Sequence, residues 1–275
     1  MEQVATVSIV LYKTPHFLIK RLMDCISNNN LIKSIYIVDN SPSPLTFDFK
    51  VYKNTIYLKN KNIGYGSSHN VVLRKIINES TFHFVLNPDI YFDANVLDEM
   101  ILRMASDSRV GLMMPKVLYP NGDLQYLCKL LPTPINLFFR RFPIFFIEKY
   151  INKINNIYEL KLTGYEIEMN VPILSGCFML FRVDALKKVG LFDERFFMYA
   201  EDMDISRRMH VSYQTIYYPK VSIIHAHAKD SFKNFKMLML HILSVIKYFN
   251  KWGWFFDSER NKVNKLILKK LRITE

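Results

Sequence analysis

Short apolar runs alternate with amphipathic stretches along the first half of the chain, roughly every 25 residues. The runs TVSIVLY (6–12) and SIYIVDNS (34–41) are rich in apolar and β-branched residues, which is typical of strands buried on both faces. Between them, PHFLIKRLMDCISNN (15–29) has the pattern of a helix that begins at its proline. This alternation predicts an α/β domain whose sheet is mostly parallel and flanked by helices.

The rest of the chain continues this rhythm with one interruption. Residues 55–77 predict a strand, a Gly/Asn loop and a helix, and residues 81–92 predict a strand that is broken at Pro88. A helix over 95–106, a strand over 110–119, a strand and helix over 171–190 and a last strand or two over 215–228 complete the pattern. Residues 120–170 fit neither period, and we expect an irregular insertion there.

Composition limits the class of protein. Half of the 275 residues are hydrophobic, which is enough to bury a large core. No apolar run reaches the roughly 18 residues of a membrane span, and the start MEQVATVSIVLYK lacks the pattern of a secretory signal. The three cysteines are an odd number and widely spaced, which favours reduced thiols. We therefore expect a cytoplasmic protein.

Positive charge is concentrated at the C-terminal end. The formal net charge is +12, and residues 229–275 hold 11 Lys and Arg against four Asp and Glu. These residues are mixed with MLMLHILSVI and WGWFF, a combination that favours a membrane surface over a nucleic-acid groove. The sequence predicts a domain over 1–228 and a basic helical extension over 229–275. Whether the extension packs on the domain or binds a membrane stays open.

Polar residues follow several of the predicted strands. In an open parallel sheet, ligands bind beyond the carboxyl ends of the strands, so these residues are expected to gather at one edge. The loop NIGYGSSHN matches neither the dinucleotide-binding fingerprint nor a P-loop. Carboxylates and an imidazole at such an edge suit a sugar nucleotide and a hard divalent cation. The set comprises Asp39, Asn40, Asp89, Glu201, Asp202 and His225, with Gly176 after a further strand.

Each of these residues also has a purely structural interpretation. Asp39 is suited to an Asx turn before Pro42, and Asp89 to an ordinary turn. Asp202 is suited to the N-cap of the helix MDISRRM, with Asp204 in its first turn. His225 and His227 share one face of a strand, but cysteine partners at zinc spacing are missing.

Taken in order, several segments resemble the family 2 glycosyltransferases of GT-A fold, and more closely the rhamnosyltransferases of O-antigen and capsule assembly. The resemblance runs from about Thr6 to about Ser231, and its most specific part is the continuous block from SGC to the acids of YAEDMDISRR. The segments are VSIVLY, IVDNS, NIGYGSSHN, LNPDI, SGCFMLFRVDALKKVGLFDERFFMYAEDMDISRR and PKVSIIHAHA.

The resemblance implies a role for each matching residue. Asp202 would be the general base, with Glu201 second to it, and Asp89 and His225 would hold Mg²⁺ or Mn²⁺. The remaining implied contacts are Val10, Tyr12, Asp39, Asn40, Asn62, Gly64, Asn70 and Asp89 for the donor, and Gly176, Arg140 and Arg141 for the acceptor.

The resemblance also implies an activity: inverting, metal-dependent transfer of one sugar, with L-rhamnose from dTDP-rhamnose favoured, to a polyprenyl-diphosphate-linked saccharide at the inner membrane face. The QxxRW motif of processive relatives is absent, which favours a single addition. A UDP-hexose donor stays open, as does a non-catalytic basic protein that binds a lipid or nucleic-acid surface. A sugar-1-phosphate nucleotidyltransferase is disfavoured, because YKTPHF stands where its Gly/Arg-rich triphosphate loop should follow the first strand.

Overall fold

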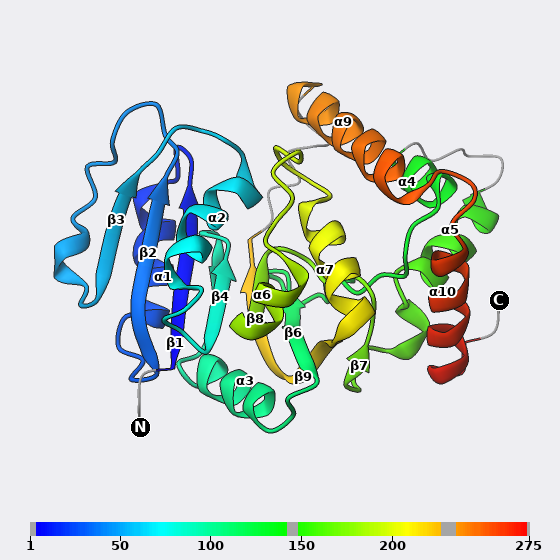
Figure 1. The fold of residues 1–275 in the computed structure, drawn as a ribbon, viewed down its shortest axis with the longest axis horizontal. Coiled ribbons are helices and arrows are strands. Elements are labelled where there is room, and N and C mark those ends of the chain that lie inside the picture. Colours follow the sequence, from blue (N-terminus) through cyan, green and yellow to red (C-terminus); the bar gives the residue numbers. More distant parts are fainter. Residues whose placement is uncertain (1–3, 142–147, 227–234, 274–275) are drawn as a thin grey trace.

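One mixed sheet forms the centre of the molecule (Figure 1). A computed structural model describes residues 4–141, 148–226 and 235–273 of the chain. Within these ranges the sheet has nine strands, which are β1 (Ala5–Leu11), β2 (Ile32–Asp39), β3 (Thr55–Lys59), β4 (Phe82–Leu86), β5 (Ile90–Tyr91), β6 (Val110–Leu118), β7 (Met169–Asn170), β8 (Phe178–Arg182) and β9 (Gln214–His225).

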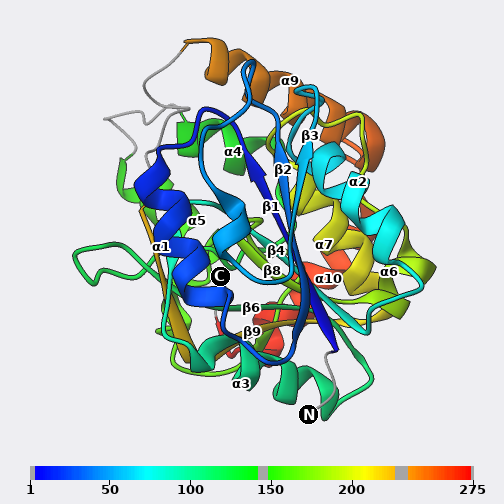
Figure 2. The same cartoon turned by 90° about the vertical axis from the view of Figure 1, so that its left-hand side faces the viewer.

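Helices lie on both faces of this sheet, with α1 on one face and α2, α6 and α7 on the other (Figure 2). The described α-helices are α1 (His16–Ile26), α2 (Tyr65–Ile76), α3 (Asn95–Ala105), α4 (Pro134–Arg141), α5 (Glu148–Tyr158), α6 (Val183–Val189), α7 (Glu201–Ser212), α9 (Phe235–Trp252) and α10 (Ser258–Lys270). Short 3₁₀ turns occur at Phe49–Val51 and Lys161–Thr163. Covered faces explain the continuous apolar runs: every residue of β1 and of β4 is buried.

Strand directions bring the carboxyl ends of most strands to one edge. The sheet order is β3-β2-β1-β4-β8-β6-β9-β5, and β7 also pairs with β9. Strands β3, β2, β1 and β4 are mutually parallel. Strand β8 is antiparallel to both β4 and β6, so β6 and its parallel neighbour β9 run the same way as β1. The predicted, mostly parallel α/β sheet is confirmed, and the ends of β1, β2, β4, β6 and β9 share one edge.

Two local predictions can be compared with the structure. The break at Pro88 is confirmed, since β4 ends at Leu86 and β5 pairs with β9 across the sheet. Residues 120–170 are less irregular than expected, because they contain α4, α5 and β7. Their helical period is obscured in the sequence because α4 is apolar on two sides: Leu137 is buried, whereas Ile135 and Phe138 are exposed.

The last two helices pack against the rest of the fold. The Ser244 hydroxyl donates a hydrogen bond of 2.7 Å to the Met198 carbonyl, and Tyr248 and Phe249 on α9 are buried. An ion pair of 2.8 Å joins Arg207 on α7 to Asp257, which precedes α10. Among the described residues, no helix combines the length and the apolar composition needed to cross a membrane. The boundary at residue 228 stays a prediction.

Candidate active site

The two catalytic candidates lie in the first turn of α7, directly after a sharp backbone turn. Tyr199 and Ala200 both have positive φ angles, 68° and 64°, which non-glycine residues rarely adopt. Strained backbone of this kind is concentrated at functional sites. Helix α7 begins at Glu201, so Ala200 and not Asp202 is the N-cap. Carboxylates in the first turn are stabilised by the positive end of the helix dipole.

The Asp202 carboxylate is half-buried and has fixed partners. Its Oδ2 accepts a hydrogen bond of 3.0 Å from the Gly176 backbone N–H, and its Oδ1 accepts one of 2.8 Å from Met203 N–H. A β-carbon at Gly176 would lie 3.2 Å from the Asp202 Cβ, so glycine allows this close approach. The structure thus brings together a predicted base and a predicted acceptor residue.

Glu201 is in a different environment although it is the next residue. Its side chain is buried, and Oε2 has no hydrogen-bond partner. Burial, followed by the neighbouring charge of Asp202, raises the pKa of Glu201 to about 8. At neutral pH the Glu201 carboxyl is therefore mostly protonated, so it can donate a hydrogen bond but is poorly suited to accept a proton.

Tyr65, which the sequence analysis did not select, lies among the candidate groups. Its hydroxyl is 2.8 Å from Asn87 Oδ1 and 2.9 Å from the Gly176 carbonyl oxygen. Burial raises its pKa well above the usual range, and nearby Glu201 raises it further, as do Asp202 and Asp89 to a smaller degree. In the sequence, the only signals that could have selected these two residues were the position of Tyr65 within NIGYG and that of Asn87 within LNPD.

Asp89 and His225 form the second pair of candidates. Asp89 Oδ1 lies 3.4 Å from His225 Nε2, and the Asp89 carbonyl accepts a hydrogen bond from Ala226 N–H. The Gln125 amide holds His225, with Oε1 3.1 Å from Nδ1 and Nε2 donating to the His225 carbonyl at 2.8 Å. Burial lowers the pKa of His225, but Cys177 and Asp89 more than offset this and raise it to about 10.

The resemblance implies that Asp89 and His225 hold Mg²⁺ or Mn²⁺. Asp89 Oδ1 and His225 Nε2 lie 3.4 Å apart, so one divalent ion can contact both atoms once the imidazole releases its proton. In the described part of the chain, no group of three His, Cys, Asp or Glu residues gathers at a possible metal site. The two side chains fit an ion that takes its other ligands from water and from the phosphates of a bound nucleotide, as Mg²⁺ commonly does.

The residues predicted for the nucleoside lie at the ends of β1 and β2. Asp39 is buried; its Oδ1 accepts from Ser41 N–H at 2.9 Å, as an Asx turn requires, and its Oδ2 accepts from the Tyr57 hydroxyl at 2.6 Å. Asn40 donates to Ser68 Oγ at 2.7 Å. Val10 is almost fully buried and Tyr12 is half exposed. This geometry agrees with both interpretations of Asp39, as the start of an Asx turn and as a contact for the nucleoside, because the turn holds the carboxylate at the edge of the sheet.

The predicted donor loop is joined to the segment before α7. Gly64 has a φ angle of 102°, and a β-carbon there would lie 2.3 Å from the Phe197 carbonyl oxygen. Asn62 Oδ1 is 3.4 Å from Gly64 N–H. Asn70 is directed elsewhere than expected: it donates to the Phe192 carbonyl at 2.8 Å and accepts from Phe192 N–H at 3.0 Å. The Asn70 side-chain amide therefore holds the segment that leads to α7. Its nitrogen and its oxygen both already have hydrogen-bond partners in that segment.

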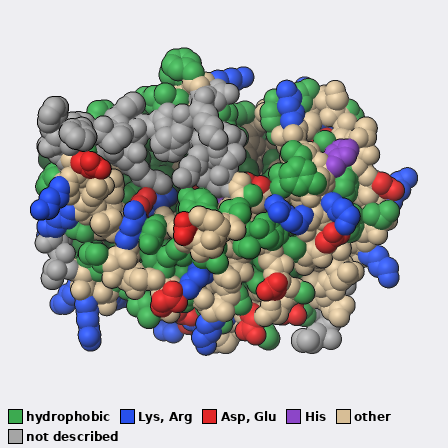
Figure 3. All heavy atoms as spheres, turned by 180° about the vertical axis from the view of Figure 1, so that it is seen from behind, with side chains coloured by type: hydrophobic (Ala, Val, Ile, Leu, Met, Phe, Trp, Pro, Cys, Tyr) green, Lys and Arg blue, Asp and Glu red, His purple; other side chains and the backbone are tan. Residues whose placement is uncertain are grey.

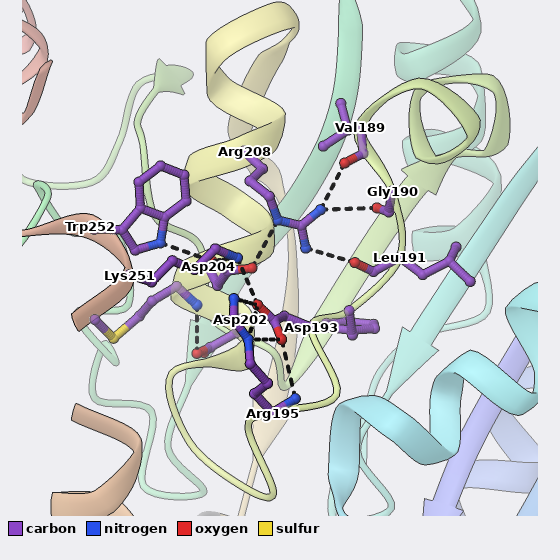
Figure 4. A network of polar contacts seen from close by, with 12 residues as sticks. Val189, Gly190, Leu191, Asp193, Arg195, Asp202, Asp204, Arg208, Lys251 and Trp252 are labelled. Atoms are coloured by element: carbon purple, nitrogen blue, oxygen red, sulfur yellow. Dashed lines mark hydrogen bonds and ion pairs between the residues drawn. The ribbon is translucent and has the colours of Figure 1, made fainter. Parts of the chain in front are cut away.

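The third carboxylate of the EDMD segment does not face Asp202. Asp204 is fully buried and accepts from Arg208 Nε at 2.8 Å and from Trp252 Nε1 at 2.8 Å, and Lys251 Nζ lies 2.6 Å away (Figure 4). Arg208 also donates to the carbonyls of residues 189–191, and Lys251 also pairs with Asp193. Asp204 thereby connects α7 to α9 and to the preceding loop.

The remaining acceptor predictions lie partly outside the described residues. Arg140 and Arg141 are in the last turn of α4, but their side chains are not described, and His227 is outside the described ranges. Gln125, which holds His225, also lines a cavity of about 450 Å³. Its lining combines aromatic and charged side chains, namely Tyr119, Asp123, Leu124, Gln125, Tyr126, Leu127, Glu159 and Lys161.

Comparison with known proteins supports the fold and the class of enzyme. The chain is 26% identical over 225 residues to an N-acetylglucosaminyl-diphospho-decaprenol L-rhamnosyltransferase of Mycobacterium tuberculosis, covering 72% of this chain and 68% of the relative. The solved mannosyltransferase PcManGT of Pyrobaculum calidifontis, in complex with GDP-Man and Mn²⁺, has a TM-score of 0.61 at 14% identity over 98% of this chain and 68% of that chain. The chain is a glycosyltransferase of GT-A fold.

Further structures agree on the fold. This glycosyltransferase matches S. aureus TarS residues 1–349 in complex with UDP, with a TM-score of 0.58 at 13% identity over 97% of this chain and 71% of that chain. It also matches GalNAc-T7 with UDP, GalNAc and Mn²⁺, with a TM-score of 0.59 at 12% identity over 81% of this chain, although it spans only 43% of that chain. No family model matches the chain. The predicted resemblance to rhamnosyltransferases is confirmed.

Proposed function

We propose that this enzyme transfers a single sugar, with L-rhamnose from dTDP-rhamnose favoured, to a polyprenyl-diphosphate-linked saccharide in cell-surface polysaccharide synthesis, with inversion at the anomeric carbon. The observation that carries the proposal is the half-buried Asp202 carboxylate at the strained start of α7, next to the buried, mostly neutral Glu201. The mycobacterial relative named for a decaprenol-linked acceptor supports the sugar and the acceptor class.

Asp202 is suited to take the proton of the acceptor hydroxyl as that hydroxyl attacks. A hydroxyl is a weak nucleophile, and a carboxylate within hydrogen-bonding distance assists its attack. The N–H groups of Gly176 and Met203 hold the carboxylate in one orientation, as a general base requires. Neutral Glu201 adds no second negative charge beside this carboxylate, and its Oε2 is buried without a hydrogen-bond partner. Attack opposite the leaving diphosphate gives inversion.

The donor diphosphate would bind at the Asp89 end of the site. Asp89 and His225 would hold Mg²⁺ or Mn²⁺, which when bound neutralises negative charge on the leaving group. The Tyr65 hydroxyl donates to the Gly176 carbonyl, and the N–H of the same glycine holds Asp202. The Tyr65 hydroxyl would therefore be close to the sugar that moves.

Thermal unfolding with nucleotides tests the donor class. The purified chain is heated with dTDP, UDP, GDP or CMP, each with and without Mn²⁺. A ligand at about 100 times its dissociation constant adds about 2.7 kcal/mol to the free energy of unfolding. We expect a Mn²⁺-dependent shift with dTDP. A shift with UDP in place of dTDP would replace the rhamnose donor by a UDP-sugar, and no shift with any of them would contradict the donor site.

The role of Asp202 is tested separately. Asp202→Asn should retain the nucleotide-dependent thermal shift but lose about 10²- to 10⁴-fold in sugar transfer, because it removes the base and little else. Asp184→Asn is the matched control, since Asp184 is an exposed residue of α6. If Asp202→Asn transferred sugar at the wild-type rate, the assignment of the base would be wrong.

A further inference from the structure

Helix α9 has apolar side chains on two opposite sides. One side, with Ser244 and Tyr248, is buried against the domain. The opposite side carries the α9 stripe, which we define as Phe235, Met239, Leu243 and Ile246 with exposed fractions of 77%, 41%, 48% and 37%. Spacings of four, four and three residues put these side chains on one helix face. A surface helix usually has polar residues on its outer face, so packing within the chain does not account for the stripe.

A second group of exposed apolar residues continues the stripe beyond the end of α9. The aromatic loop consists of Trp254, Phe255 and Phe256, with exposed fractions of 37%, 74% and 98%. Trp254 Nε1 donates a hydrogen bond of 2.8 Å to Asn250 Oδ1. Asn250 follows Ile246 by four residues, so it lies on the same face of α9. The stripe and the loop therefore form one exposed surface.

Basic residues outnumber acidic ones in this part of the chain. Residues 235–273 contain nine Lys and Arg and two Asp and Glu. Lys236 and Lys247 are exposed on α9 itself. Hydrophobic and basic side chains stand at the upper edge of the molecule, where α9 lies (Figure 3). Two copies of this surface would repel each other, whereas an anionic surface would attract it.

We propose that the α9 stripe and the aromatic loop dock on an anionic lipid membrane. Apolar side chains, aromatic residues and lysines in one surface are the features of an interfacial helix. The inference rests on the proposed function in one respect, namely that the acceptor is lipid-linked. The same helix holds the catalytic segment: Ser244 bonds Met198, and the rings of His241 and Tyr199 are 5.1 Å apart. Docking would hold the start of α7 about 10 Å from the lipid surface, with α9 between them.

Vesicle flotation tests the proposal without donor or acceptor, so its failure is distinct from failure of the proposed function. The full chain is mixed with vesicles of phosphatidylcholine alone or with about one third phosphatidylglycerol. We expect it to bind the anionic vesicles, and less at high salt. Two double variants, Phe255→Ser/Phe256→Ser and Met239→Ser/Leu243→Ser, should each bind the anionic vesicles at least about tenfold more weakly than the wild type. Circular dichroism and thermal unfolding verify that both variants are folded.

The matched control removes two equally exposed apolar residues elsewhere. Phe17 on α1 and Leu102 on α3 have exposed fractions of 67% and 58%, so Phe17→Ser/Leu102→Ser should bind vesicles like the wild type. Absence of wild-type binding to anionic vesicles would overturn the proposal. The proposal would also be overturned if the control variant lost as much vesicle binding as the test variants, or if both test variants bound vesicles like the wild type. A dimer that dissociates in the test variants, without vesicle binding, would assign the surface to a second copy.

Discussion

Replacing Asp204 by Asn tests whether α9 stabilises α7 through a buried charge. Asp204 is fully buried, and two cations and an indole N–H surround its carboxylate (Figure 4). Removing one partner of a buried ion pair costs about 3–5 kcal/mol. Lys251 and Arg208 keep other partners and are 20% and 17% exposed, which favours the lower end. We expect Asp204→Asn to lower the free energy of unfolding by about 3 kcal/mol.

Urea denaturation of three variants and one control gives the measurement. Lys251→Met should be destabilising by itself, but the double variant with Asp204→Asn should cost less than the sum of the two, because both changes remove the same interaction. Asp184→Asn serves as the surface control and should leave stability essentially unchanged. A loss below about 1 kcal/mol for Asp204→Asn, or strict additivity with Lys251→Met, would refute the role assigned to this network.

Three further predictions concern single positions. Because the pKa of Glu201 is raised to about 8, the folded state holds a proton that the unfolded state releases, so stability should fall by roughly 1 kcal/mol per unit as pH rises from about 4.5 to about 8. Glu201→Gln should remove that slope in thermal unfolding at several pH values, and an unchanged slope would contradict the assignment. Gly64→Ala should destabilise by about 2 kcal/mol or more, whereas Gly122→Ala, with a φ angle of 87° and open space, should show only the backbone cost of about 1 kcal/mol. If the two glycine variants lost similar amounts of free energy of unfolding in denaturant melts, the contact between Gly64 and the loop before α7 would be disproved. Asp89→Asn should abolish the Mn²⁺-dependent part of the nucleotide thermal shift, and retention of that part would exclude Asp89 as a ligand.

The C-terminal helices change how the lipid hypothesis must be tested. Deleting residues 235–275 would remove Lys251 and Trp252, which contact Asp204, and Asp257, which pairs with the buried Arg207. Loss of activity in such a truncation would therefore report on the catalytic helix as well as on lipid binding. Substitutions confined to the exposed side chains of the α9 stripe and the aromatic loop separate the two effects.

Local sequence patterns were sufficient to predict the sheet and the edge at which the site lies. The β-branched runs of β1 and β2 are buried on both faces, and such runs have few alternatives to a covered strand. Proline at position 88 cannot continue a strand ladder, so the break before Asp89 was also a local property. The regular alternation of these elements then determined that Asp39 and Asp89 follow strands at one edge.

The environment of each carboxylate on α7 was decided only by the tertiary structure. Glu201, Asp202 and Asp204 lie within four positions, and 3.6 residues per turn direct them to different sides of α7. Burial leaves Glu201 mostly neutral, and the Gly176 N–H orients Asp202. Helix α9, more than 40 residues later, supplies two of the three partners of Asp204. Local sequence specifies the backbone and the order of the three carboxylates. The charge state and the partners of each carboxylate depend on groups that only folding brings close to it.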